Sequence, residues 1–225
     1  MCAANQMEYE KVIKYILSLV TDGKLTVGSK LPTERALSET LDMGRNSIRE
    51  ALSILHGMGI IKRVQGSGNY ISDDVDKSLH NMLVIMLALG TVTKKDVCEF
   101  RRTLDKTACM IILQKGINDI DKSRFESCIS GMKTDDSIRQ AEFDREFHAL
   151  LLELSDNILL RMVMEAVMTV YRQWIDIVLK EADKEAVSQL LVFHEGIYKG
   201  LTEANEDFVN MNIDAHYDLI EEFIV

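Results

Sequence analysis

The sequence predicts a mainly α-helical protein with two domains, and three observations support this expectation. The only proline, Pro32, and seven of the twelve glycines fall within the first 68 residues. The rest of the chain carries long stretches with apolar residues at helical spacing and few helix breakers. Between these parts, the polar segment 73–78 has the composition of a short linker. We therefore expect one domain over residues 1–72 and a second over residues 79–225.

The first domain reads as three helices followed by a β-hairpin. Helical spacing of apolar residues runs from Tyr9 to Val20, and a second short helix is expected after Pro32 as far as Leu41. A third helix is expected over 46–57, after a turn at 42–44. Alternating residues over 60–71, interrupted by the glycine-rich tip 65–68, predict the hairpin. This order of elements is that of a winged helix-turn-helix.

The second domain is predicted to be an all-α antiparallel bundle of six or seven helices. Apolar periodicity places these helices near 79–89, 94–115, 118–131, 136–154, 157–181, 184–202 and 206–224. The expected architecture is therefore a winged module followed by a helical bundle.

Composition limits the classes of function. With 225 residues and 47% hydrophobic content, the chain can form a substantial core. It has no apolar run of membrane-spanning length, and its first residues lack the layout of a secretory signal, so we expect a cytoplasmic protein with no membrane partner. The four cysteines show no CxxC spacing and are expected to be reduced.

Charge is distributed unevenly along the chain. The net charge of −10 would argue against a nucleic-acid partner. Residues 1–72, however, hold nine Lys and Arg against seven Asp and Glu, whereas the remainder holds 17 against 29. The first domain is therefore at +2 and the second at −12. Because phosphate contacts act over about one Debye length, ~8–10 Å, a basic module on an acidic body can still bind DNA.

Polar side chains gather where a winged module would read DNA. Arg45, Asn46, Ser47 and Arg49 lie at or near the start of the third predicted helix, where a recognition helix presents donors to bases and phosphates. Arg35, early in the second helix, is expected to contact the DNA backbone. The wing tip, which includes Gln65 and Gly66, allows main-chain N–H groups to approach a phosphate. The alternative is that Arg45 and Arg49 form ordinary surface ion pairs with Glu50 or Glu34.

Four segments of the first domain resemble the GntR family signature: GSKLPTER at 28–35, RNSIREAL at 45–52, LHGMGII at 55–61 and GSG at 66–68. The resemblance covers nearly the whole domain. It implies operator contacts by Arg35, Arg45, Arg49 and Gly66. The chain departs from the family at 43–44, where Met-Gly replaces the frequent Val-Ser.

Four ionisable residues in the second domain fall on apolar helical stripes. Asp144 and His148 lie one turn apart between Ala141, Phe147 and Leu151, and His194 and His216 occupy comparable positions on two later helices. An unpaired carboxylate buried among apolar side chains would cost several kcal/mol. One divalent cation would satisfy all four groups, and zinc, nickel or manganese is expected. The alternative for each histidine is an ordinary hydrogen-bonded core residue.

The segment FDREFH at 143–148, with His194 and His216, resembles the FCD effector domain of the FadR subgroup of GntR regulators. The resemblance implies metal binding by the matching Asp and three His. Ser155-Asp156-Asn157 departs from the commoner Ser-Gly-Asn turn.

Arg101 lies on the stripe formed by Val97, Leu104 and Ala108, so its guanidinium is predicted to point into the bundle. It could hold the carboxylate of an organic-acid effector. The alternative is an i,i+4 pair with Asp105 on a half-exposed face. In relatives a corresponding arginine contacts ligand, which favours the effector role.

The leading hypothesis is a regulator that binds a palindromic operator in double-stranded DNA as a homodimer, under control of a small carboxylate bound at the metal site. No catalytic residues are expected. Two alternatives remain: a purely structural or sensed metal ion, and a metal-dependent hydrolase in which the metal ion activates water.

Overall fold

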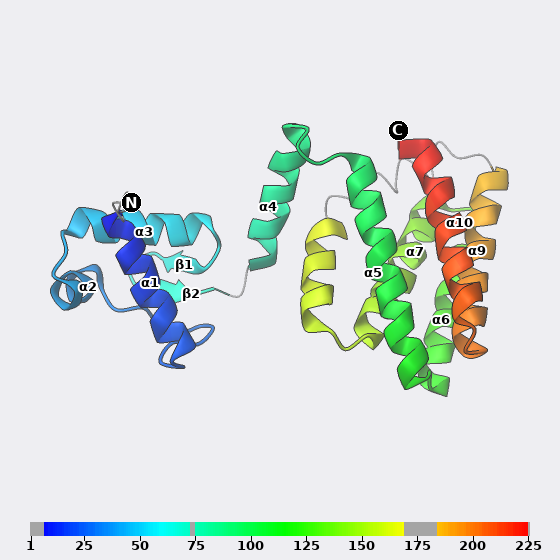
Figure 1. Cartoon of the computed structure of the whole chain (residues 1–225), viewed down its shortest axis with the longest axis horizontal. Coiled ribbons are helices and arrows are strands. Elements are labelled where there is room, and N and C mark those ends of the chain that lie inside the picture. Colours follow the sequence, from blue (N-terminus) through cyan, green and yellow to red (C-terminus); the bar gives the residue numbers. More distant parts are fainter. Residues whose placement is uncertain (1–6, 73–74, 169–183, 225) are drawn as a thin grey trace, which may run out of the picture. The chain divides into compact units, whose positions relative to one another are not determined.

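The computed structural model describes residues 7–72, 75–168 and 184–224. The chain divides into two compact units, Met1–Leu79 and His80–Val225, and each is described by itself. Figure 1 shows the helices and the hairpin in chain order.

The first unit contains three helices and a two-stranded antiparallel sheet. The elements are α1 (Glu8–Thr21), α2 (Glu34–Leu41), α3 (Arg45–Gly57), β1 (Ile61–Val64) and β2 (Gly68–Ile71). The apolar faces of the three helices close one core, in which Ile16, Leu37 and Leu52 are almost fully buried. The expectation of a winged helix-turn-helix is confirmed, and each predicted boundary lies within a few residues of the observed one.

A tight turn connects α2 to α3. The side chain of Thr33 caps α2 by accepting a hydrogen bond from the Ala36 amide. Asp42 ends the helix in the left-handed conformation, with φ of 50°. The Ser38 hydroxyl donates to the carbonyl of Met43 at 2.6 Å, which fixes the turn from inside. This turn sets the direction of α3.

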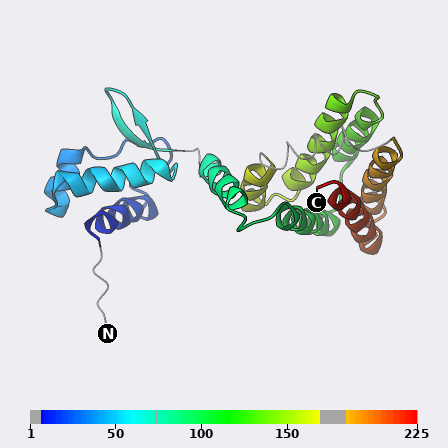
Figure 2. The same cartoon turned by 90° about the horizontal axis from the view of Figure 1, so that it is seen from above.

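The hairpin carries the wing. Ile61 pairs with Ile71 and Val64 with Gly68, which leaves 65–67 as the connecting turn. Gly66 has φ of 74°, a backbone conformation that residues other than glycine rarely adopt. Figure 2 shows the hairpin extending beyond the helices of its own unit.

The second unit is helical throughout its described residues. Helix α4 (Val75–Ala88) begins before the boundary after Leu79 and continues into the second unit. It is followed by α5 (Lys94–Lys115), α6 (Asp119–Met132), α7 (Ser137–Leu154), α9 (Lys184–Thr202) and α10 (Glu206–Ile224). A further helical segment covers 158–168. A helix was predicted over 157–181, and the part of it after residue 168 lies outside the described residues. The helix expected from 79 begins at Val75, so residues 75–78, expected in a linker, are helical.

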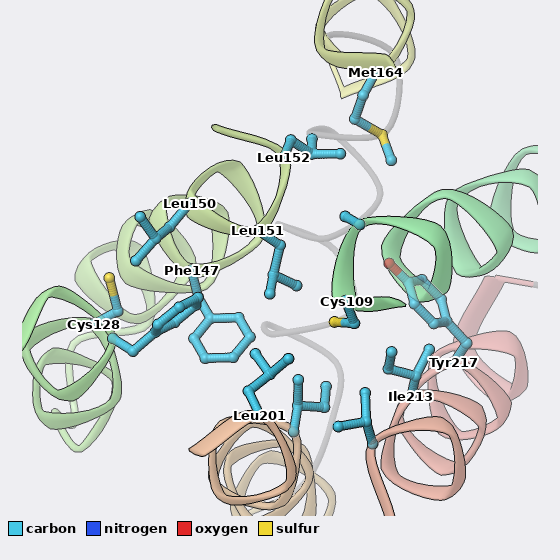
Figure 3. Packing of buried hydrophobic residues seen from close by; sticks show 14 of the residues in the cluster. Cys109, Cys128, Phe147, Leu150, Leu151, Leu152, Met164, Leu201, Ile213 and Tyr217 are labelled. Carbon is cyan, nitrogen blue, oxygen red and sulfur yellow. The ribbon is translucent and has the colours of Figure 1, made fainter. Parts of the chain in front are cut away.

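The helices of this unit pack around a single core. α9 packs along α10, α10 along α5, and α7 along α5 and α6. The rings of Phe125 and Phe147 meet edge to face at 5.1 Å between centroids. Figure 3 shows Phe147 and Leu151 from α7 directed toward Leu201 and Ile213. Helices α6, α7, α9 and α10 therefore converge on one core. The polar cluster described below lies among these helices.

The thiols of Cys98, Cys109 and Cys128 are buried, and none of the three forms a disulfide within the described part of the chain. Within the described ranges, none of the helices has the length and apolar content needed to cross a membrane.

Candidate metal centre and DNA-binding surface

The four residues singled out on apolar stripes come together in the second unit. α7 supplies Asp144 and His148, α9 supplies His194, and α10 supplies His216. Each offers one ligand atom, and these four atoms lie within 4.8 Å of one another. All four side chains are buried. The structure therefore brings the four predicted residues together, in an arrangement that could hold a metal ion.

Short distances connect the members of this cluster. His194 Nε2 lies 3.2 Å from Asp144 Oδ1 and 3.2 Å from His148 Nε2. His148 Nε2 lies 3.8 Å from the same carboxylate oxygen. The rings of His194 and His216 are 4.6 Å apart between centroids. Two imidazole Nε2 atoms and one carboxylate oxygen therefore face a common point.

The protonation states favour cation binding. Burial lowers the pKa of His148, and it lowers that of His216 well below the ordinary value. Burial would raise the pKa of Asp144, but the hydrogen bond from His194 and the charge of His148 outweigh it and hold that pKa below its usual range. Metal ions bind an unprotonated imidazole nitrogen and an ionised carboxylate, so the lowered pKa values of His148, His216 and Asp144 all favour cation binding.

Unsatisfied polar atoms in the cluster provide a test of fit. Among the described residues, neither ring nitrogen of His216 has a hydrogen-bond partner, and Asp144 Oδ2 has none. Buried polar atoms are normally hydrogen-bonded, and an isolated orphan costs about 1–3 kcal/mol. A divalent ion bound by three imidazoles and one carboxylate would engage these groups, so the residues present fit a metal ion.

A cavity of about 470 Å³ adjoins the cluster and shares His148 with it. Its lining includes three arginines and two glutamates: Arg101, Arg145, Arg161, Glu153 and Glu165. Ala149, Leu152, Met164 and Met168 supply its apolar lining. Part of the negative charge is already engaged, because Glu153 accepts two hydrogen bonds from Arg124 at 2.8 and 2.7 Å. The lining therefore carries an excess of positive charge, which favours an anion.

Arg101 points inward, as its helical stripe predicted. Its exposed fraction is 0%, and that of Asp105, one turn later on α5, is 1%. The alternative of a pair on a half-exposed face is therefore wrong about exposure. Arg101 is nevertheless close to Asp105. Burial raises the pKa of Asp105, and the interaction with His148 lowers it. The charge of Arg101 lowers the same pKa by a smaller amount.

Two residues next to the cluster, Asp105 and Tyr217, were not predicted from the sequence to belong to a site. Asp105 accepts a hydrogen bond from His148 Nδ1 at 2.7 Å. It also accepts one from the hydroxyl of Tyr217, the residue that follows His216. The available signal was the spacing of Arg101 and Asp105, which places both on the buried face of α5.

The predicted DNA-reading residues lie on the surface of the first unit. Arg45 and Asn46 begin α3 and are exposed, as are Arg35, Gln65 and Gly66. Ser47 is half-buried and donates to Glu8 on α1 at 2.6 Å. In this structure Ser47 therefore supports the start of the recognition helix as well as facing outward in part.

A groove of about 540 Å³ separates α3 from the wing. Arg49 and Ser53 line its helical side, and Arg63, Gln65 and Gly66 line the wing side. The Arg49 guanidinium donates to Glu34 at 2.8 Å, as the ion-pair alternative expected. Arg35 similarly pairs with Glu39 on its own helix at 2.8 Å.

Arg63 is a basic residue of this groove that the sequence reasoning did not select. It lies on β1 and donates to the Ser53 hydroxyl of α3 at 2.8 Å. The available signal was its position on the strand that leads to the predicted wing tip, where Lys62 and Arg63 are both exposed and burial does not alternate.

A recognition helix, a glycine-tipped wing and an acidic helical unit with a buried ligand cluster define a DNA-binding transcription regulator of the winged-helix class. Residues 8–71 match the family described as bacterial regulatory proteins, gntR family, and residues 96–219 match the FCD domain. The chain belongs to the GntR family and carries an FCD domain, the architecture of the FadR subgroup.

Several curated relatives carry names of transcription regulators. The chain is 27% identical over 212 residues to the HTH-type regulator YcbG of Bacillus subtilis, covering 94% of this chain and 85% of that one. It is 26% identical to LutR of the same organism, covering 92% and 96%. It is 28% identical over 155 residues to the Glc operon transcriptional activator of Escherichia coli, covering 66% and 61%.

Among solved structures, Streptococcus agalactiae GntR superposes with a TM-score of 0.63 at 24% identity, covering 95% of this chain and 99% of that one. This likeness supports the fold. The family and the named relatives are regulators rather than enzymes, so the hydrolase alternative is not favoured.

Proposed function

We propose that this chain is a cytoplasmic regulator whose affinity for a DNA operator is set by a small carboxylate bound beside a divalent metal ion. Residues 1–72 bind DNA, and residues 79–225 bind the effector and form the homodimer. The observation that carries the proposal is the shared position of His148, which belongs both to the four-ligand cluster and to the cavity lined by Arg101.

The metal site is formed by Asp144, His148, His194 and His216. Zinc suits three imidazoles and one carboxylate best, with nickel or manganese as alternatives. An ion bound there would supply positive charge and retain coordination positions for a carboxylate oxygen.

Arg101 supplies the second half of the effector site. Its guanidinium has fixed donors that match the two oxygens of a carboxylate. Because Arg101 and His148 line the same cavity, an anion in that cavity can reach both. A cavity of about 470 Å³ accommodates a small organic acid. A purely structural metal ion would need no adjoining cavity, so the cavity supports effector binding over that alternative.

DNA recognition is assigned to Arg35, Arg45, Asn46, Ser47, Arg49, Gln65 and Gly66. Arg45 and Asn46 begin the exposed end of α3, and Arg49 faces the groove beside the wing. Arg49 must exchange its ion pair with Glu34 for a contact with DNA. That pair is exposed, and exposed pairs contribute only about 0–1 kcal/mol, so the exchange costs little.

Calorimetric titration of citrate, lactate and gluconate into the zinc-loaded protein tests the effector site. Arg101→Ala should abolish or strongly weaken binding of the acid that the wild type binds. Arg102→Ala is the matched control, because the neighbouring Arg102 pairs outward with Asp218 and Glu221 on α10. Equal binding by the wild type and Arg101→Ala would contradict the assignment of Arg101.

A further inference from the structure

Asp105 is a buried carboxylate that is not among the four ligand residues. Its Oδ2 accepts hydrogen bonds from His148 Nδ1, at 2.7 Å, and from the Tyr217 hydroxyl. Asp105 therefore lies one imidazole away from the ligand cluster, on the side of the ring opposite to His148 Nε2.

The bond to Asp105 determines which nitrogen of His148 can bind a cation. A neutral imidazole has one N–H, and a carboxylate at Nδ1 holds the proton there. The lone pair then lies on Nε2, the atom 3.2 Å from His194 Nε2 and 3.8 Å from Asp144 Oδ1. Asp105 thus presents the acceptor atom of His148 to the other ligands.

The three histidines differ in this support. His194 Nδ1 lies 2.7 Å from the carbonyl of Leu190 on its own helix, which is a neutral acceptor. His216 has no hydrogen-bond partner at either nitrogen among the described residues. Among the described residues, only His148 of the three has a carboxylate at Nδ1, and that carboxylate comes from a different helix. A charged acceptor raises the basicity of a ligand imidazole more than a neutral one does.

Tyr217 holds Asp105 from the opposite side. It lies next to His216 on α10, and its hydroxyl fixes the same oxygen that His148 uses. The guanidinium groups of Arg101 and Arg102 lie 5.8 and 5.9 Å from the centre of its ring. Figure 3 shows the Tyr217 hydroxyl directed toward α5. Asp105 is therefore a common point for α5, α7 and α10.

We propose that Asp105 is a positioning residue of the metal site, which holds His148 in the metal-binding tautomer and, through Tyr217, joins three helices around the bound ion. This inference rests on the metal site of the proposed function. It adds that metal affinity depends on a residue that does not touch the ion.

The test is zinc affinity, measured on the purified full-length chain by competition with a chelator of known affinity. Asp105→Asn should lower zinc affinity 10–100-fold, the range known for such outer ligands. Asparagine is a neutral acceptor, and its amide can instead donate to Nδ1, which moves the histidine proton to Nε2 and blocks that atom. Tyr217→Phe keeps the carboxylate and should lower affinity less than tenfold.

Asp214→Asn is the matched control for a merely structural effect. Asp214 also connects α10 to α5, through Lys106 at 2.7 Å, but it lies on the outside of the bundle. This variant should bind zinc within about twofold of the wild type, a change corresponding to less than half a kcal/mol.

A double-mutant cycle with His148→Ala separates positioning from general destabilisation. If Asp105 acts through His148, Asp105→Asn should cause no further loss of zinc affinity in the His148→Ala background. Full additivity, or unchanged affinity in both Asp105→Asn and Tyr217→Phe, would overturn the proposal while leaving the metal site in place. A wild type that binds no zinc, nickel or manganese would refute the metal site itself, and this proposal with it.

Discussion

Gly196 of α9 lies directly against the side chain of Asn212 of α10. A Cβ atom added at Gly196 would lie 2.1 Å from Asn212 Oδ1, closer than any real contact. One turn later, a Cβ at Gly200 would lie 2.6 Å from Val209 Cγ2. The two glycines allow α9 and α10 to approach closely, and these are the helices that carry His194 and His216. The spacing of the candidate metal ligands therefore depends on residues without side chains.

Replacing Gly196 by alanine should force α9 away from α10. Overpacking of this kind costs about 1–3 kcal/mol, and the separation of the two histidines should also weaken zinc binding. Thermal unfolding with and without zinc measures both effects. Gly57→Ala is the control, because a Cβ there meets nothing within 4 Å, and it should leave zinc affinity unchanged. Unaltered stability and zinc affinity in Gly196→Ala would show that the close approach is unimportant.

Removal of the metal ion should destabilise the protein. An ion bound only to the folded state stabilises it by about 2.7 kcal/mol when its free concentration is 100 times Kd. His216→Ala should lose most of this stabilisation in zinc and show a smaller loss in EDTA, because neither nitrogen of His216 has a hydrogen-bond partner among the described residues.

Melting temperatures measured in zinc and in EDTA test the metal prediction. His56→Ala should respond to zinc like the wild type, since His56 is an exposed residue of the first unit. If EDTA leaves the wild-type melting temperature unchanged and no metal is taken up, the cluster consists of ordinary core residues.

Arg45→Ala and Arg49→Ala should each weaken operator binding by about 1–3 kcal/mol if the lost contact is to a base. If the lost contact is to a phosphate, the slope of log binding constant against log salt concentration should instead become shallower by about one. Fluorescence anisotropy at several salt concentrations distinguishes the two. Arg139→Ala makes the same change of charge at an exposed position of α7 and should leave affinity close to that of the wild type. Wild-type affinity and salt dependence in both Arg45→Ala and Arg49→Ala would remove these residues from the DNA contact.

The fold was largely predictable because its signals are local. Pro32 and Thr33 indicate the start of α2, and Gly66 indicates the tip of the wing. The start of α4 was missed because the segment 73–78 is polar, and polar composition alone does not distinguish a linker from the first turn of a helix. Asp156, at the departure from the Ser-Gly-Asn turn, adopts φ of 54°, the conformation that glycine usually supplies.

The candidate site was predictable only in part. Asp144 and the three histidines could be selected because each interrupts an apolar stripe on its own helix. The link from Asp105 to His148 spans 43 residues, and the link from Tyr217 to Asp105 spans 112, so no helical period reveals either. Arg63 was missed because short strands give a weaker periodic signal than helices.

The full-length protein should bind one palindromic operator as a homodimer. A single winged module makes few base contacts, and a two-fold dimer doubles them. Sedimentation with labelled DNA should give two chains per duplex, and deletion of one half-site should reduce affinity sharply. Tight binding of one chain to a single half-site would contradict the dimeric mode.

The most direct test of effector control is the operator affinity of the zinc-loaded protein with and without its carboxylate. A ligand that binds two conformations with equal affinity does not change the equilibrium between them. Coupling between two binding sites is reciprocal. The acid should therefore change operator affinity by about 5–150-fold, and the operator should change the affinity for the acid by the same factor. Arg101→Ala should bind the operator normally but show no response. An operator affinity that stays constant while the acid saturates the wild-type protein would contradict the account.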